Sequence, residues 1–284
     1  MAEILKGADI VKFLNDKMRE DLIFLNSKSI VPTLAILRVG ERPDDISYEK
    51  TAEKRCETIG VIVKKVLLPS DVTQETLMKK IQALNNDISV HGILMFRPLP
   101  PHLDESAVVA ALSPEKDVDG ITNDTWAKVV TGSGRGFAPC TAAACLEILD
   151  FYKIDVKGKN VCIIGHSLVV GRPVGIMLLG RDATVTICHV FTNDTASFSK
   201  KADIVIVAVG KGEFFDANYF SPGQVVIDVG INWSEEKKKL VGDVKFDDVE
   251  PLVGHITPVP GGVGTVTTSV LVSNVVAAAK NQAI

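Results

Sequence analysis

The sequence contains few cysteines, and they form no recognisable pattern. They are odd in number, widely spaced and without a Cys-x-x-Cys pair: Cys56, Cys140, Cys145, Cys162 and Cys188. Such a set indicates neither a disulfide framework nor a zinc site. A reducing compartment fits this usage, so we expect a cytoplasmic protein without a bound metal.

An excess of basic residues is also missing. The 284 residues include 31 Lys and Arg against 35 Asp and Glu, which gives a formal net charge of −4. Nucleic acids and anionic membranes favour basic surfaces, so we expect neither as a partner and expect small molecules instead. We also find no apolar run of roughly 18 residues and no targeting segment, because the first twenty residues start directly in an amphipathic helical pattern.

Strand-like and helical segments alternate in the first half of the chain. The apolar stretches predict strands at 32–40, 61–68 and 90–96, with helical patterns at 46–59 and 73–85. This alternation predicts a parallel sheet covered by helices on both faces. The proline-rich stretch "RPLPPHLDE" (97–105) predicts an extended loop at the carboxyl end of a strand, where α/β sheets place their sites.

A second series of buried-looking strands predicts a second sheet. Its strands are expected at 160–165, 183–188, 202–210 and 224–230. The stretch "ITPVPGGVGT" (256–265) is too rich in proline and glycine for a regular element. An apolar helical tail (266–281) follows and is able to pack back on the first lobe, so we expect an α/β protein with two lobes.

A glycine-containing turn follows the first strand of the second series. Gly165 ends the strand, and Ser167, Gly171 and Pro173 lead into a helical run. Gly165 allows a sharp turn, Gly171 allows close approach to a ligand, and the helix N-terminus suits a pyrophosphate. A tight turn without a ligand is the alternative.

The residues after the next strand do not choose between NAD and NADP. An acid there suits the ribose 2′-hydroxyl and an arginine suits a 2′-phosphate, but this chain has His189 and Val190. Protonated His166 is able to contact a 2′-phosphate, and a solvated surface histidine is the alternative.

Several stretches together resemble the methylenetetrahydrofolate dehydrogenase/cyclohydrolase family of one-carbon metabolism. They run in order along nearly the whole chain: "SYEKTAEKRCETIG", "RPLPPHLDE", "PEKDVDGIT", "FAPCT", "GKNVCIIGHSLVVGRPV", "ATVTICH", "VIDVGIN", "GDV" and "ITPVPGGVGTVT". The resemblance implies a folate-binding catalytic domain (1–139 plus 266–284), a Rossmann-like dinucleotide-binding domain (140–265), a cleft between them and a homodimer. It also implies hydride transfer from 5,10-methylenetetrahydrofolate to NAD(P)⁺, giving the 5,10-methenyl derivative.

The resemblance also implies roles for single residues. Tyr48 and Asp119 would be the catalytic pair, with Tyr48 stacked on the aminobenzoyl group and Asp119 bonded to the pterin, whose adjacent N–H groups one carboxylate can accept. A core aromatic and a turn residue are the alternatives. The substrate would also be bordered by Phe96, Pro98, Leu99, Pro260, Gly261 and Gly262. The dinucleotide would be bound by Gly165, His166, Ser167, Val170, Gly171, Pro173, His189, Val190, Gly210, Gly230, Ile231 and Asn232.

Two positions depart from the family pattern. Ala52 stands where bifunctional members carry the lysine of the cyclohydrolase step, and Phe96 stands where they carry its partner glutamine. On a helix Lys50 lies about 200° and Lys54 about 120° from Tyr48, while Arg55 returns to the same face about 10 Å further along. Arginine holds its proton too firmly to act as a base. We therefore expect a dehydrogenase with weak or absent cyclohydrolase activity.

Alternatives remain open. The enzyme is bifunctional if another residue, such as Lys54, replaces the missing lysine. A non-catalytic folate-binding protein and a shikimate- or hydroxyacid-type dehydrogenase are more distant alternatives. NADP is favoured by family habit and NAD is possible, because His166 and Val190 stand where NADP-using members often carry arginine and serine or arginine. Arg97 either binds the glutamate tail of the substrate or is solvated.

Overall fold

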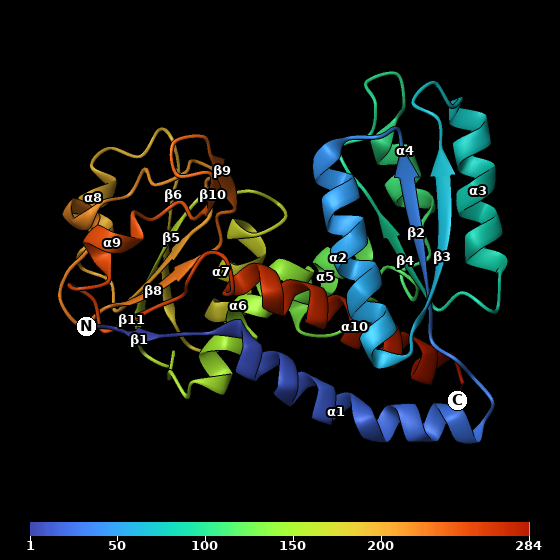
Figure 1. The fold of residues 1–284 in the computed structure, drawn as a ribbon, viewed down its shortest axis with the longest axis horizontal. Coiled ribbons are helices and arrows are strands. Elements are labelled where there is room, and N and C mark those ends of the chain that lie inside the picture. Colours follow the sequence, from blue (N-terminus) through green and yellow to red (C-terminus); the bar gives the residue numbers. More distant parts are fainter. Residues whose placement is uncertain (284) are drawn as a thin grey trace. The chain divides into compact units, whose positions relative to one another are not determined.

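The first series of strands forms a three-stranded parallel sheet in a computed structural model that describes residues 1–283 (Figure 1). Its order is β3 (Ile62–Leu68), β2 (Thr33–Val39), β4 (Gly92–Met95). All seven residues of β2 are buried, as expected for a central strand covered on both faces. The helices of this part are α2 (Pro43–Ile59), α3 (Gln74–Asn86), α4 (Glu105–Ala111) and α5 (Asn123–Thr131).

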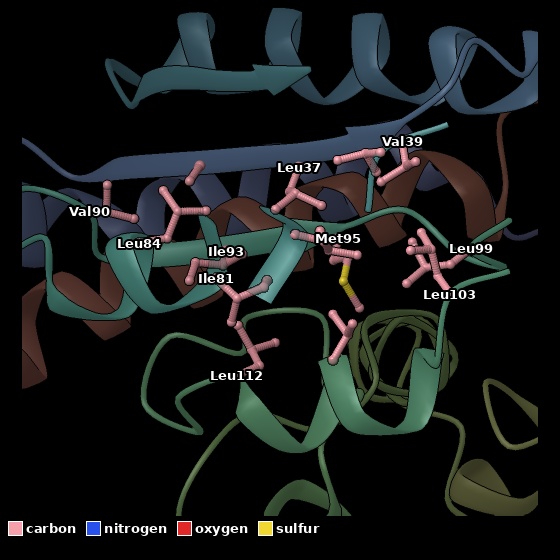
Figure 2. Close-up of a cluster of buried hydrophobic side chains, with 14 residues drawn as sticks. Leu37, Val39, Ile81, Leu84, Val90, Ile93, Met95, Leu99, Leu103 and Leu112 are labelled. Atoms are coloured by element: carbon pink, nitrogen blue, oxygen red, sulfur yellow. The ribbon is translucent and has the colours of Figure 1, made fainter. Parts of the chain in front are cut away.

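Alternate side chains of this sheet enter one hydrophobic cluster. Figure 2 shows Leu37 and Val39 of β2 and Met95 of β4 lying with Ile81 of α3. Leu99, from the proline-rich loop, packs at the end of the same cluster, so the core anchors the loop that follows β4. The loop therefore starts from a fixed point at the carboxyl end of the sheet.

The second series forms a six-stranded parallel sheet. Its order is β1 (Glu3–Ile4), β11 (His255–Ile256), β8 (Val225–Asp228), β7 (Ile204–Val207), β5 (Asn160–Ile164), β6 (Thr184–Cys188). The chain goes from β5 to β6 on one side and then to β7 on the other, so the strand order reverses between β5 and β7. The crevice outside the carboxyl ends at such a reversal is where open α/β sheets bind ligands.

Two long helices, α1 and α10, and several short elements complete the described part of the chain. They are α1 (Gly7–Ser27), α6 (Cys140–Phe151), α7 (Gly171–Leu179), α8 (Thr195–Ser199), the 3₁₀ helix η1 (Ala217–Tyr219), β9 (Asn232–Ser234), β10 (Lys239–Val241), α9 (Phe246–Val249) and α10 (Val263–Gln282). β9 and β10 form an antiparallel hairpin that the sequence reading did not predict, because three-residue strands around a highly charged loop show no periodicity.

The chain divides into two compact units. One contains Met1–Lys12 and Thr141–Thr267, and the other contains Phe13–Cys140 and the tail from Thr268. The tail, which belongs to α10, packs on β4 of the three-stranded sheet: a Cβ added to Gly92 would lie 3.1 Å from Val275 Cγ2. This grouping is consistent with the expectation that the tail packs back on the first lobe.

The first residues differ from expectation. The chain does not start directly in a helix, because residues 3–4 form β1 and pair in parallel with β11. This pairing places residues 1–12 in the unit with the six-stranded sheet, whereas we expected them in the folate-binding domain. Two residues are too few for a strand to show periodicity in the sequence.

One helix of the described residues, α10, is long and apolar enough to span a membrane by composition. Two-thirds of its apolar window, 67%, is buried inside the structure. We had expected no apolar run of that length. Burial of this kind is what the core helix of a packed domain shows, so composition alone does not make α10 a membrane span.

Candidate functional site

Helix α2 presents Tyr48 beside a buried stripe. Asp45, Glu49, Ala52 and Cys56 are buried at spacings of three and four residues, and half-buried Tyr48 borders them. Pro43 starts the helix in the first turn, and Gly60 ends it in a left-handed conformation. The stripe fixes how α2 is rotated, and this rotation places Tyr48 at the edge of the buried region.

The two departed positions lie close to this tyrosine. Ala52 is 0% exposed, one turn along α2 from Tyr48. The ring of Phe96, which follows β4, contacts the Tyr48 ring edge to face, with centroids 5.9 Å apart. Methyl and phenyl groups therefore occupy the two positions at which the resemblance leads us to expect an amine and an amide.

The nearby cations of α2 are directed elsewhere. Lys50 and Lys54 are both exposed. Arg55 donates to the Ser269 hydroxyl at 2.9 Å and to the amide oxygen of Asn15. The exposure of the two lysines agrees with their predicted positions on the helix, and neither lies in the buried stripe beside Tyr48.

Asp119 lies next to a buried carboxylate that builds its turn. Asp117, two residues earlier, is fully buried. Its oxygens accept five hydrogen bonds of 2.7–3.1 Å from four donors, which are the N–H groups of Gly120, Ile121 and Thr122 and the hydroxyl of Thr125. Asp117 thus takes the turn-building role that was the alternative for Asp119, and the Asp119 carboxylate takes part in a hydrogen bond with Cys140 instead.

The environment of Asp119 raises its pKa to about 6. Burial is the main cause and the negative charge of Asp117 adds to it, while a hydrogen bond with Cys140 and the positive charge of Arg97 lower the pKa. The pKa of the Tyr48 hydroxyl is raised well above its ordinary value by burial and by Asp119. The two predicted catalytic residues thus share one electrostatic environment, in which Tyr48 stays neutral.

The proline-rich loop is held by an acid. The Glu105 carboxylate accepts the N–H of Leu99 at 2.8 Å and pairs with the Arg97 guanidinium at 3.6 Å. Leu99 itself is buried in the core, while Pro98 is exposed. The Arg97 side chain is 29% exposed, so it is held by Glu105 and is not freely solvated.

In the other unit, the glycine turn after β5 is built by close backbone contacts. Gly165 has φ +120°, and a Cβ there would lie 2.1 Å from the carbonyl oxygen of Ala208. A Cβ on Gly171 would lie 2.0 Å from the carbonyl oxygen of Gly165. The close approach of the Gly165 carbonyl is by itself enough to require glycine at position 171, and the expected approach of a ligand there stays a prediction.

This turn borders a cavity of about 490 Å³. The cavity lies at the carboxyl ends of β5, β6 and β7, where the strand order reverses. Five of the predicted dinucleotide residues line it: Gly165, His166, Ser167, His189 and Val190. Its place, its size and the turn that borders it fit a dinucleotide.

The two histidines of this cavity come from neighbouring strands. His166 follows β5 and His189 follows β6, and their ring centroids are 5.0 Å apart. The Nδ1 atom of His189 accepts the N–H of Phe191 at 3.2 Å, so a neutral His189 carries its proton on Nε2. Arg172 is the arginine nearest to His166 in the sequence. Its guanidinium donates to the carbonyl oxygen of His166 at 2.9 Å.

The remaining predicted residues have mainly backbone roles. Val170 and Pro173 stand at the start of α7, and the Ser167 hydroxyl accepts the Val170 N–H at 3.1 Å. The carboxylate of Asp243 accepts hydrogen bonds from Gly210 and Asn232, and that of Asp228 accepts one from Gly230. The side chain of Ile231 is exposed. In the glycine-rich loop Pro260 is exposed, Gly261 accepts the Gly7 N–H at 2.7 Å, and Gly262 packs against Pro258.

Sequence reasoning missed several cavity residues. Lys211 reaches over the Phe214 ring, with its Nζ atom 5.2 Å from the centroid. These residues follow β7 in a segment with no repeating pattern, so only the fold brings them to the site. The other cavity residues that the sequence reading missed are Ile164, Thr192, Thr195, Ala208, Val209, Phe215 and Tyr219.

Comparisons with known proteins agree with this arrangement. Residues 5–119 match the model of the tetrahydrofolate dehydrogenase/cyclohydrolase catalytic domain, and residues 139–283 match that of its NAD(P)-binding domain. The chain is 45% identical over 282 residues to the bifunctional protein FolD of Alkaliphilus metalliredigens, covering 99% of both chains.

Solved structures agree as well. The bifunctional FolD methylenetetrahydrofolate dehydrogenase/cyclohydrolase of Campylobacter jejuni superposes with a TM-score of 0.95 at 39% identity, covering 99% of both chains. The Trypanosoma brucei enzyme, solved with NADP and an inhibitor, gives 0.92 at 32% identity, covering 99% of this chain and 98% of that one. Both domain models and these full-length matches confirm the resemblance and the two-domain α/β fold. The chain belongs to the tetrahydrofolate dehydrogenase/cyclohydrolase family.

Proposed function

We propose that this protein is a methylenetetrahydrofolate dehydrogenase that oxidises 5,10-methylenetetrahydrofolate to the 5,10-methenyl derivative with NAD(P)⁺. One observation carries the proposal: the same chain holds Tyr48 and a largely buried Asp119 in one unit and a dinucleotide-sized cavity at the sheet reversal of the other. The names of the relatives, which include this dehydrogenase activity, support it.

The chain's own residues hold and orient the reactants. Ionised Asp119 accepts adjacent pterin N–H groups, and the flat face of Tyr48 packs on the aminobenzoyl ring. Residues Gly165–Ser167 and His189–Val190 border the dinucleotide, whose nicotinamide ring supplies the hydride acceptor when bound. No protein base is needed for hydride removal, because the folate nitrogens stabilise the cation that forms, so positioning is the main contribution of the protein.

We further propose that the cyclohydrolase activity is weak or absent. Hydrolysis of the methenyl cation needs groups that orient water and move protons, and the methyl of Ala52 and the phenyl of Phe96 do neither. The bifunctional names of the relatives favour the alternative, in which another residue restores the activity. The exposure of Lys50 and Lys54 and the bonds of Arg55 speak against that alternative.

The cofactor is NADP by family habit, and NADP is present in the Trypanosoma brucei structure. NAD is the second candidate, because Val190 and His166 replace the usual phosphate-binding side chains and Arg172 is bonded to a carbonyl. A homodimer and a cytoplasmic location also stay predictions, as does the expectation of no nucleic-acid or membrane partner.

One assay tests the function. Purified protein is given methylenetetrahydrofolate with NAD⁺ or NADP⁺, and reduced nicotinamide and methenyl product are followed separately. We expect reduced nicotinamide to form and methenyl to accumulate until a separate cyclohydrolase is added. Binding of folate without any nicotinamide reduction would support the non-catalytic alternative, and methenyl loss well above the spontaneous rate would support the bifunctional one.

A further inference from the structure

Asp243 is a fully buried carboxylate beside the cofactor cavity, and the sequence reading gave it no role. Its Oδ2 accepts the N–H groups of Val209 at 2.7 Å and Gly210 at 3.0 Å. Its Oδ1 accepts the N–H of Lys211 at 2.8 Å and the side-chain amide of Asn232 at 3.0 Å. Four donors therefore converge on one side chain.

Three of these donors are successive backbone N–H groups that follow β7. Successive N–H groups facing one point form a nest, a geometry that binds anions. Here the carboxylate of Asp243 fills the nest. Val209 and Lys211 also line the dinucleotide cavity, so the carboxylate sets the conformation of the wall on the β7 side.

The fourth donor joins a second predicted cofactor segment to this wall. Asn232 belongs to the stretch from Gly230, and Gly230 passes directly over the carboxylate. A Cβ on Gly230 would lie 2.3 Å from the Cγ of Asp243, so glycine is required for the acid to enter. Asp243 thus ties together two segments, 209–211 and 230–232, that are far apart in the sequence.

The acid is itself fixed by a neighbour. The backbone N–H of Asp243 donates to Asp228 Oδ1 at 3.0 Å, and the same carboxylate accepts the N–H groups of Gly230 and Val244, each at 2.9 Å. Asp228 is buried at the end of β8. Asp228 therefore fixes the backbone of Asp243 relative to the carboxyl end of β8.

We propose that Asp243 is a positioning residue for the dinucleotide, which shapes the β7-side wall of the cavity by filling the nest at 209–211. The inference rests on the proposed function. Asp243 touches no reactant. It acts by holding Val209, Lys211 and the 230–232 segment in the conformation that the cofactor meets.

The substitution Asp243→Asn tests this. Asparagine keeps the size, but its NH₂ group faces N–H donors and only one oxygen remains to accept. We expect the dissociation constants of NADPH and NADH, followed by their fluorescence, to rise about tenfold, because small displacements at a binding wall are costly. The KM for methylenetetrahydrofolate should change less than about twofold. Asp248→Asn, the same change at an acid of α9 paired with Lys245, should leave both values unchanged.

A second variant keeps the inference testable if Asp243→Asn does not fold. Asn232→Ala removes the fourth hydrogen bond together with a side chain that we predicted to border the dinucleotide, and we expect a rise of about threefold in the cofactor dissociation constants, the equivalent of one ordinary hydrogen bond. Unchanged cofactor binding in a folded Asp243→Asn protein, or equal losses for folate and cofactor, would overturn the inference. If Asp243→Asn does not fold, unchanged binding in Asn232→Ala would overturn it. Because fluorescence binding needs no turnover, an inactive wild-type protein would contradict the proposed function alone.

Discussion

The Phe96 ring meets the Tyr48 ring edge to face, with centroids 5.9 Å apart and planes inclined by 85°. Edge-to-face pairs of this kind are favourable by about 0.5–1.5 kcal/mol beyond the area that they bury. The side chain at position 96 therefore offers no hydrogen-bonding group and gives Tyr48 an apolar neighbour. Phe96 thus takes part in the packing around Tyr48.

Restoring both departed residues should restore hydrolysis. The double variant Ala52→Lys/Phe96→Gln should hydrolyse methenyltetrahydrofolate at least about tenfold faster than the unchanged protein, since positioned proton-transfer groups contribute that much or more. Ala52→Lys alone should gain little, because its ammonium group would be buried beside a phenyl ring. Loss of methenyl absorbance measures the rate. Thr51→Lys, an exposed lysine one residue away, is the control, and no gain in the double variant would contradict the explanation.

Substrate affinity should depend on the ionisation of Asp119. Its pKa is raised to about 6, so the carboxylate that accepts pterin donors is present above this pH and is lost below it. The kcat/KM for methylenetetrahydrofolate should fall about tenfold per pH unit below that value. Arg97→Leu removes a charge that lowers the pKa and should move the fall to higher pH, whereas Arg97→Lys should keep it. A flat profile between pH 5 and 7 would contradict this role.

Asp228 should give stability a specific pH dependence. Burial raises its folded-state pKa to about 7 from an ordinary value of 3.8. Between these values the folded chain keeps a proton that the unfolded chain releases, so this contribution to stability is present at low pH and is lost as pH rises towards 7. The Asp228→Asn variant has no titrating group at this position and serves as the reference. As pH rises across this range, the free energy of unfolding of the unchanged protein should fall relative to that of the variant by up to about 1.4 kcal/mol per pH unit.

Urea unfolding of both proteins at pH 5, 6 and 7.5 measures the difference directly. Comparing the two proteins removes the opposite contributions of acids such as Glu49, whose pKa is lowered by its hydrogen bonds with Arg38 and Lys65 against the effect of its burial. A difference in unfolding free energy that is the same at all three pH values would show that Asp228 does not titrate in this range.

The glycine turn should tolerate no side chain. Gly165→Ala places a Cβ against the carbonyl oxygen of Ala208, and the backbone has to shift. We expect loss of most dinucleotide binding and a large drop in stability. Gly158→Ala is the matched control: its φ of +69° is also in the left-handed region but nothing lies within 4 Å, so it should cost only about 1–2 kcal/mol. Thermal unfolding and NADPH fluorescence measure both effects, and similar behaviour of the two variants would contradict the steric account.

Most of the strands of both sheets were predictable from their short apolar runs, and several of the helices between them from their amphipathic period. β2 is a continuous apolar run that is buried on both faces, as expected for a central parallel strand. The absence of a lysine beside Tyr48 followed from helix geometry alone. These features depend on residues close together in the chain.

The sequence by itself therefore determined the α/β class, the glycine turn and the family. It also determined that alanine stands at position 52, where the resemblance leads us to expect lysine. Only the tertiary structure decided that β1 joins the sheet of the other domain, that the turn itself requires glycine at position 171, that Phe96 packs on Tyr48, and that Asp243 gathers two distant segments. The physical reason is the range of the interaction. Periodicity records which face of a local element is buried, whereas a contact between residues far apart in the chain exists only after the fold has brought them together.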